Sequence, residues 1–210
     1  NPQTAYAECK VKVENDLTPM NDANFTTCFM RNATAYGASP RQRFDIVLND
    51  LCGLAWTTKE IKLLSDGKPW RPLVHALDMC QAVYCALKAD QDKIAGQRMN
   101  VGSTDQNYRV IDIAKIVAAE FPDCKLTVGE PSADNRSYRV NFDKIRKLMP
   151  DFECQWTAEK GAAQLHKVFK AIDMTPEVFQ APPYTRLKML MKYKANGLLS
   201  DDLYWSAPDL

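Results

Sequence analysis

Tyr6 and Lys10 combine a phenol and an ammonium group four residues apart, a pair that could transfer a proton. Residues four apart lie on one face of an α-helix, so a helix here would project both side chains together. A free phenol holds its proton too tightly to be an efficient base near neutral pH, but a neighbouring ammonium group favours the phenolate. The pair could therefore take the proton of an alcohol and, in reverse, protonate the oxygen of a ketone. Because such a pair is also common on solvated helix faces, its spacing alone does not identify an enzyme.

The helices and strands that could position this pair are predicted from apolar spacing and chain-breaking residues. Helices are expected over residues 4–16, 44–56, 77–88, 110–120, 142–148, 157–171 and 183–195. Strands are expected over residues 25–31, 61–64, 70–76, 98–101 and 126–128, and residues 137–140 are a candidate strand end. Asp66 and Gly67 form a predicted turn between the second and third of these strands. The alternation predicts an α/β fold.

The size and charge of the chain limit the classes of partner. Its 210 residues suit one domain, or one domain with a lobe. Lys and Arg total 27 and Asp and Glu total 26, so the net charge of +1 gives no support for a nucleic acid or an anionic membrane as partner. No apolar run approaches the roughly 18 residues that a membrane span needs. Neither a nucleic acid nor a membrane is expected as a partner.

The cysteines and histidines are informative about the compartment and about metals. The seven cysteines are an odd number, form no Cys-x-x-Cys pair and are scattered through apolar stretches. This pattern is typical of free thiols in a reducing cytoplasm, which is the expected location. His75 and His166 are the only histidines, and the clustered ligands of a zinc site are missing, so no metal is predicted.

Six segments follow one another in the order that is found in a known family. They are Pro2-Gln3-Thr4-Ala5-Tyr6-Ala7-Glu8-Cys9-Lys10, Arg31-Asn32-Ala33-Thr34-Ala35-Tyr36-Gly37, Asp45 to Leu51 with Asn49 inside it, Gly67 to Asp78 with Arg71 and His75 inside it, Met99-Asn100-Val101-Gly102, and Asp134 to Val140 with Arg136 inside it. Together these segments resemble the NAD-dependent epimerase/dehydratase family of the extended short-chain dehydrogenases/reductases. The resemblance covers nearly all of the chain up to about Val168.

This resemblance implies a reaction and a cofactor. A family member would bind NAD or NADP and act on a nucleotide-activated sugar, as an epimerase or as a dehydratase. Tyr6 would move the proton of the sugar hydroxyl, and Lys10 would hold the nicotinamide ribose, so both are candidate catalytic and cofactor-binding residues. Cys9 departs from the usual Ser or Thr at a position that carries no chemical group of the reaction. The family's catalytic Ser or Thr would precede Asn1.

The resemblance also implies four substrate-binding residues. Arg71 and Arg136 fall where family members contact the diphosphate, and a guanidinium suits phosphate because it donates a planar fork of hydrogen bonds. Asn32 and Asn49 match positions that hydrogen-bond the sugar-phosphate region. Arg139 remains the alternative to Arg136. His75 and Asp78 are expected to orient the backbone rather than to touch a ligand.

The same resemblance implies which parts of the chain belong to the cofactor side and which to the substrate side. Residues 1–35 and about 77–105 are expected to be remaining elements of a Rossmann-like parallel sheet. Residues about 36–76 and 106–210 are expected to form the smaller α/β substrate-binding lobe with the C-terminal helices. The chain contains no G-x-x-G-x-x-G turn, which a dinucleotide fold needs for the pyrophosphate. The N-terminal dinucleotide-binding half of such an enzyme is therefore expected to be missing, and this chain alone is expected to be inactive.

Alternatives remain open at this point. The chain could belong to an NAD(P)-dependent reductase or dehydrogenase of another small carbonyl substrate, or to a non-catalytic binding protein that kept the fold. The sugar nucleotide, and the choice between NAD and NADP, are not decided by these residues. A homodimer is also open, because family members often pair through the helix that carries the Tyr and the Lys.

Overall fold

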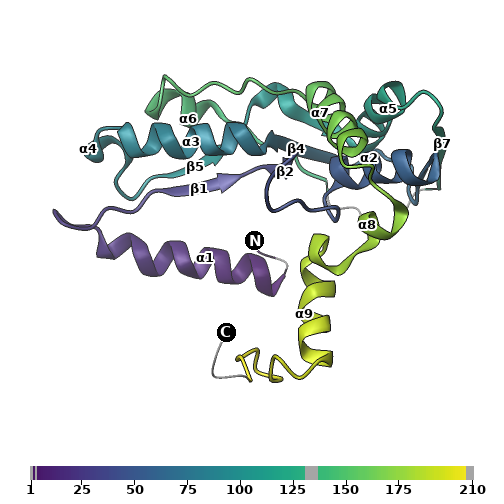
Figure 1. The fold of residues 1–210 in the computed structure, drawn as a ribbon. Helices are drawn as coiled ribbons and strands as arrows, with labels where there is room; N and C mark the ends of the chain where they lie inside the picture. Colours follow the sequence, from purple (N-terminus) through teal and green to yellow (C-terminus); the bar gives the residue numbers. More distant parts are fainter. Residues whose placement is uncertain (1, 3, 131–136, 207–210) are drawn as a thin grey trace. The chain divides into compact units, whose positions relative to one another are not determined.

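The computed structural model describes residues 2, 4–130 and 137–206, and this part of the chain forms two compact units. The first unit contains residues 1–35, 70–108 and 137–156, and the second contains residues 36–69, 109–136 and 157–210. Helices and strands alternate along both, which confirms the predicted α/β class (Figure 1). This division reflects the compactness of each unit and does not show which residues bind a cofactor or a substrate. The division into cofactor and substrate parts therefore stays a prediction.

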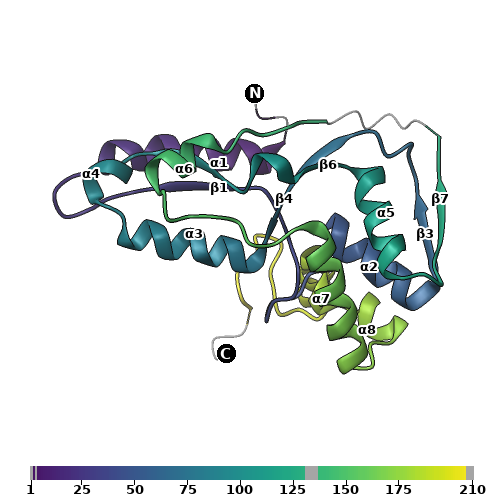
Figure 2. The same cartoon turned by 90° about the horizontal axis from the view of Figure 1, so that it is seen from above.

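The first unit is built on two strands that pair in parallel. Its elements are α1 (Ala5–Leu17), η1 (Thr18–Met20), β1 (Phe29–Asn32), β2 (Thr34–Tyr36), β4 (Trp70–His75), α3 (Ala76–Lys88), α4 (Gln91–Ile94), β5 (Arg98–Val101), η2 (Thr104–Gln106), β6 (Asn107–Arg109) and α6 (Asp143–Leu148), with the last residues of β2 and β6 counted in the second unit. β1 pairs with β5 from Phe29 opposite Arg98 to Asn32 opposite Val101. The other three strands follow the order β2-β4-β6. α1 and α3 lie on opposite sides of the β1–β5 pair (Figures 1 and 2).

An apolar cluster holds the first unit together on the side of α3 and α6. Its buried members are Val74, Ala82, Cys85, Ile94, Met99, Val101, Phe142, Ile145, Met149 and Phe152. Gly102 follows β5 with a φ of 152°, and a Cβ there would meet the Phe142 ring at 2.7 Å. The chain therefore needs glycine at this turn, because any side chain would displace a core ring.

The second unit packs helices around another parallel pair. Its elements are α2 (Val47–Thr58), β3 (Glu60–Leu63), α5 (Val110–Glu120), β7 (Lys125–Val128), α7 (Ala158–Ala171), α8 (Pro176–Gln180), η3 (Pro182–Tyr184) and α9 (Arg186–Ala195). β3 pairs with β7 from Glu60 opposite Lys125 to Leu63 opposite Val128, and Figure 2 shows α5 beside this pair. A buried Phe44 contacts the rings of Phe169 and Phe179. None of the helices among the described residues is long and apolar enough to cross a membrane.

Most predicted helices and strands are confirmed. The differences concern very short strands and the pairing of strands that are far apart in the sequence. The helix over residues 110–120 is confirmed, and Thr157 caps α7 by accepting a hydrogen bond from the Lys160 amide. The strand expected over residues 25–31 begins only at Phe29, and residues 137–140 form no strand. The turn at residues 66–67 joins no hairpin, because β3 pairs with β7 whereas β4 lies between β2 and β6. The sequence does not predict β2 and β6, because three residues each are too few to show a period.

Candidate active site

Tyr6 and Lys10 lie together on an exposed face of α1. Thr4 begins the helix, since its Oγ1 accepts a hydrogen bond of 3.2 Å from the amide of Ala7. The Lys10 Nζ lies 5.4 Å from the centre of the Tyr6 ring, and Tyr6 is 73% exposed. The phenol and the ammonium group are therefore adjacent, as helical spacing requires, and both side chains are exposed to solvent.

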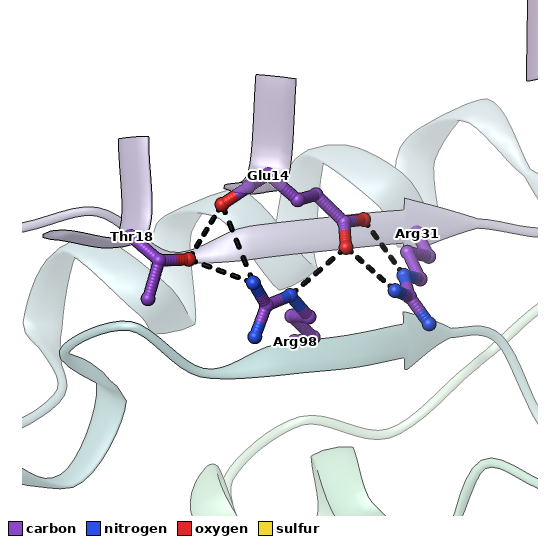
Figure 3. A network of polar contacts seen from close by, with 4 residues as sticks. All are labelled: Glu14, Thr18, Arg31 and Arg98. Atoms are coloured by element: carbon purple, nitrogen blue, oxygen red, sulfur yellow. Dashed lines mark hydrogen bonds and ion pairs between the residues drawn. The ribbon is translucent and has the colours of Figure 1, made fainter. Parts of the chain in front are cut away.

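A third residue on α1, Glu14, has partners that are distant in the sequence. The Glu14 carboxylate accepts hydrogen bonds from Arg31 on β1 and from Arg98 on β5 (Figure 3). Glu14 lies four residues after Lys10, so its place on the helix could be read from the sequence. Its partners could not, because they lie 17 and 84 residues away.

Asn32 lines a hollow of about 210 Å³ in the first unit. The hollow opens at the carboxyl ends of β1 and β5, and its lining residues are Arg31, Asn32, Ala33, Thr34, Pro72, Asn100, Tyr138, Val140 and Phe142. The Arg71 guanidinium lies 5.7 Å from the Tyr138 ring centre and donates a hydrogen bond of 2.9 Å to the Trp70 carbonyl. The first unit therefore places Arg71 beside a wall of the hollow that Asn32 lines.

Asn49 is buried in the second unit, where its amide holds a loop. Its Oδ1 accepts a hydrogen bond of 2.9 Å from the Gly37 amide, and its Nδ2 donates one of 2.9 Å to the Arg43 carbonyl. Only 2% of Asn49 is exposed. The structure thus gives this side chain a positioning role for the loop of residues 37–43, and its contact with a substrate stays a prediction.

Arg136 lies outside the described residues. Its alternative, Arg139, is exposed, and its guanidinium lies 4.7 Å from the ring centre of Trp70. Arg71 and Arg139 therefore each lie over an aromatic ring of the first unit.

Residues 1–102 match a known protein family. This segment, which carries the Tyr–Lys pair, β1 to β5 and the hollow's Asn32 and Asn100, matches the model of the NAD dependent epimerase/dehydratase family. The first half of this chain thus resembles the NAD-dependent epimerase/dehydratase family.

Solved structures of known enzymes share the fold of this chain. The UDP-glucuronic acid 4-epimerase from Bacillus cereus, solved with UDP-glucuronic acid and NAD, is 17% identical with a TM-score of 0.67, over 82% of this chain and 54% of that one. RMD from Pseudomonas aeruginosa, solved with NADPH, is 14% identical with a TM-score of 0.68, over 82% of this chain and 58% of that one. ADP-L-glycero-D-manno-heptose-6-epimerase from Helicobacter pylori is 20% identical with a TM-score of 0.68, over 81% and 52%. The chain thus matches the Rossmann-like fold of these enzymes over between 52% and 58% of their length.

His75 and Asp78 accept hydrogen bonds from backbone amides, as predicted. The His75 Nδ1 accepts a hydrogen bond of 3.1 Å from the Leu77 amide, and the imidazole stacks on Trp156 with ring centres 3.9 Å apart. The Asp78 carboxylate accepts hydrogen bonds of 2.9 and 3.2 Å from the amides of Gln155 and Trp156. Both buried side chains therefore fix the start of α3 against the segment that ends the first unit.

Asp50, the residue after Asn49, has a carboxyl group with a raised pKa. Burial, which is the larger cause, and the negative charge of Asp45 together raise this pKa from 3.8 to about 6. Unfolded Asp50 loses its proton near its usual value, whereas folded Asp50 keeps it until about pH 6, so stability falls as the pH rises through this window. We expect Asp50→Asn to be more stabilising at about pH 7.5 than at about pH 4, by about 1–2 kcal/mol after allowance for partial exposure. Thermal unfolding at both pH values measures this difference.

Asp112→Asn is the matched control for Asp50→Asn. The Arg109 hydrogen bond lowers the pKa of the Asp112 carboxyl, so its amide variant should show the opposite dependence on pH. An Asp50→Asn effect that is equal at both pH values contradicts a raised pKa of the Asp50 carboxyl.

Proposed function

We propose that this chain carries the Tyr–Lys part of the active site of an NAD(P)-dependent epimerase or dehydratase that acts on a nucleotide-activated sugar. The observation that carries the proposal is the accessible Tyr6–Lys10 pair on α1, within the segment that matches the family. In this proposal, residues 1–35 and about 77–105 contribute to the cofactor side. Residues about 36–76 and 106–210 contribute to the substrate side.

In the proposed reaction, Tyr6 exchanges a proton with the sugar. Its Oη takes the proton of a sugar hydroxyl as the carbon is oxidised and gives it back when the carbon is reduced. The Lys10 Nζ favours the phenolate and donates hydrogen bonds to the ribose hydroxyls of the cofactor. When bound, NAD(P) supplies the redox chemistry by accepting a hydride from the sugar carbon and returning it. An epimerase would return the hydride to the other face, and a dehydratase would lose water before the return.

The residues present fit one end of the dinucleotide. A phenol and an ammonium group side by side on an exposed helix face suit the nicotinamide ribose and the reacting hydroxyl. The 210 residues contain no G-x-x-G-x-x-G turn, so they offer the pyrophosphate no matching loop. Lys10 and Tyr6 would therefore hold the reacting end, and the adenine end has no assigned residues in this chain.

The substrate is proposed to be a sugar that carries a nucleoside diphosphate. The solved neighbours include a UDP-glucuronic acid 4-epimerase and an ADP-heptose 6-epimerase. Arg71, beside the hollow that Asn32 lines, is proposed to bind the diphosphate, together with Arg136. Asn32 and Asn49 are proposed to contact the sugar-phosphate region. All seven cysteines are free thiols, which supports a reducing compartment such as the cytoplasm.

The proposed diphosphate contact is tested by Arg71→Ala in the complete enzyme. Loss of a charge-assisted hydrogen bond should raise KM, or lower kcat/KM, roughly ten- to a hundredfold for the nucleotide sugar. Arg136→Ala should have an effect in the same direction. Steady-state kinetics with a panel of nucleotide sugars measure the change.

Arg146→Ala is the control, because Arg146 is an exposed arginine of α6 in the same unit. Unchanged kinetics in both the Arg71 and the Arg136 variants would remove the diphosphate clamp from the proposal.

A further inference from the structure

The helix that carries Tyr6 and Lys10 has no buried side chain. Its least exposed members are Ala7, Glu14 and Leu17, and the other residues of α1 are exposed. Apolar burial is the usual way in which a helix is held on its neighbours. In the described part of the chain, α1 must therefore be held largely by something else.

Polar contacts near the C-terminal end of α1 supply this hold (Figure 3). Arg31 donates two hydrogen bonds to the Glu14 carboxylate, from Nε at 2.7 Å and from Nη2 at 2.5 Å. Arg98 donates from Nε to the same carboxylate at 3.0 Å, and from Nη2 to the Glu14 carbonyl at 3.3 Å and to the Thr18 Oγ1 at 2.8 Å. Only 13% of the Glu14 side chain is exposed. One carboxylate thus joins α1 to two strands.

The two arginines reach Glu14 from one face of the strand pair. Arg98 lies opposite Phe29 in the β1–β5 register, and Phe29 and Arg31 are two residues apart on β1. Side chains two apart on a strand point to the same face, so both guanidinium groups project toward α1. The contacts therefore join the C-terminal part of α1 to both strands.

The position of Glu14 on the helix connects this contact to the reacting pair. Tyr6, Lys10 and Glu14 follow one another at intervals of four residues, which places them along one side of α1. Glu14 is two turns from Tyr6, about 12 Å along the axis. Because a helix moves as a rigid rod over such a length, a rotation or a slide at Glu14 displaces Lys10 and Tyr6 by a similar amount.

We infer that Glu14 is a positioning residue, which sets the place of Tyr6 and Lys10 by bridging Arg31 and Arg98. This inference rests on the proposed function of the Tyr–Lys pair. A displacement of the reacting groups by about 1 Å is enough to slow a reaction substantially. The role of Glu14 is therefore to hold geometry, and it requires no contact between Glu14 and the substrate.

The test compares Glu14→Gln with Asp16→Asn in the complete protein. Both variants remove one negative charge from α1, but Asp16 is exposed and lies outside the contacts of Glu14. Hydrogen exchange followed by mass spectrometry should show roughly tenfold faster exchange of the α1 amides in Glu14→Gln, with β1 and β5 unchanged. Asp16→Asn should leave α1 as in the wild type.

Kinetics then separate positioning from stability. Glu14→Gln should lower kcat roughly tenfold per folded enzyme while KM for the nucleotide sugar stays the same, and Glu14→Asp should recover part of the loss. If Glu14→Gln does not fold, Arg98→Lys carries the same measurements, because it keeps the charge and loses the fork of contacts.

Two outcomes overturn the inference. One is α1 exchange that stays at the wild-type rate in Glu14→Gln, and the other is exchange that rises equally over the whole first unit. A wild-type protein without turnover on any nucleotide sugar would instead refute the proposed function, and the exchange of α1 would still decide how the helix is held.

Discussion

Tyr6→Phe is expected to lower turnover by about 10²-fold or more while cofactor binding survives. The variant removes only the hydroxyl that exchanges the proton, and it keeps the ring beside which Lys10 lies at 5.4 Å. Since Tyr6 is 73% exposed, the loss of the hydroxyl should not unfold the chain. The measurement is kcat of the complete enzyme on its nucleotide sugar, beside the affinity for NAD and NADP.

Tyr84→Phe provides the matched control, because Tyr84 is an exposed tyrosine that lies beside Lys88 on another helix of the first unit. It repeats the tyrosine–lysine contact away from the segment of residues 2–10. An active Tyr6→Phe enzyme would show that another group is the base, and the assignment of Tyr6 would be wrong.

Residues 1–210 alone are expected to bind NAD(P) weakly or not at all, and to show no epimerase or dehydratase activity. The chain contains the reacting end of the proposed cofactor site but no G-x-x-G-x-x-G turn for the pyrophosphate. Among the described residues β1 pairs with β5 alone, and a parallel pair with an open edge favours aggregation. Calorimetric titration of the soluble chain with NAD and with NADP measures the affinity.

The same titration on the complete gene product is the comparison, and it should show saturable binding. Micromolar affinity of residues 1–210 alone would contradict the expectation. It would mean that residues assigned here to the fold, rather than a glycine-rich turn, build the dinucleotide site.

Those features of the fold and the site that depend on neighbouring residues could be predicted from the sequence. Helical spacing alone places Tyr6 beside Lys10, and a Thr before an apolar period marks where α7 begins. The order of the motifs predicted the family whose model matches residues 1–102. The α/β class follows from the alternation of periods, which is also a property of neighbouring residues.

The strand pairing and the side-chain contacts that join these elements could not be predicted, because their partners are far apart in the sequence. The partner of β3 is β7, which follows more than sixty residues later, and not the next strand β4. The Asn49 amide matches a substrate-binding position by sequence, but in the folded chain it bonds Gly37 and Arg43. Glu14 looks like any acidic residue of a solvated helix until Arg98, 84 residues away, reaches it. The physical reason is that helical spacing and capping depend on residues within a turn or two. Strand pairing and ion pairs depend on which distant segments folding brings together.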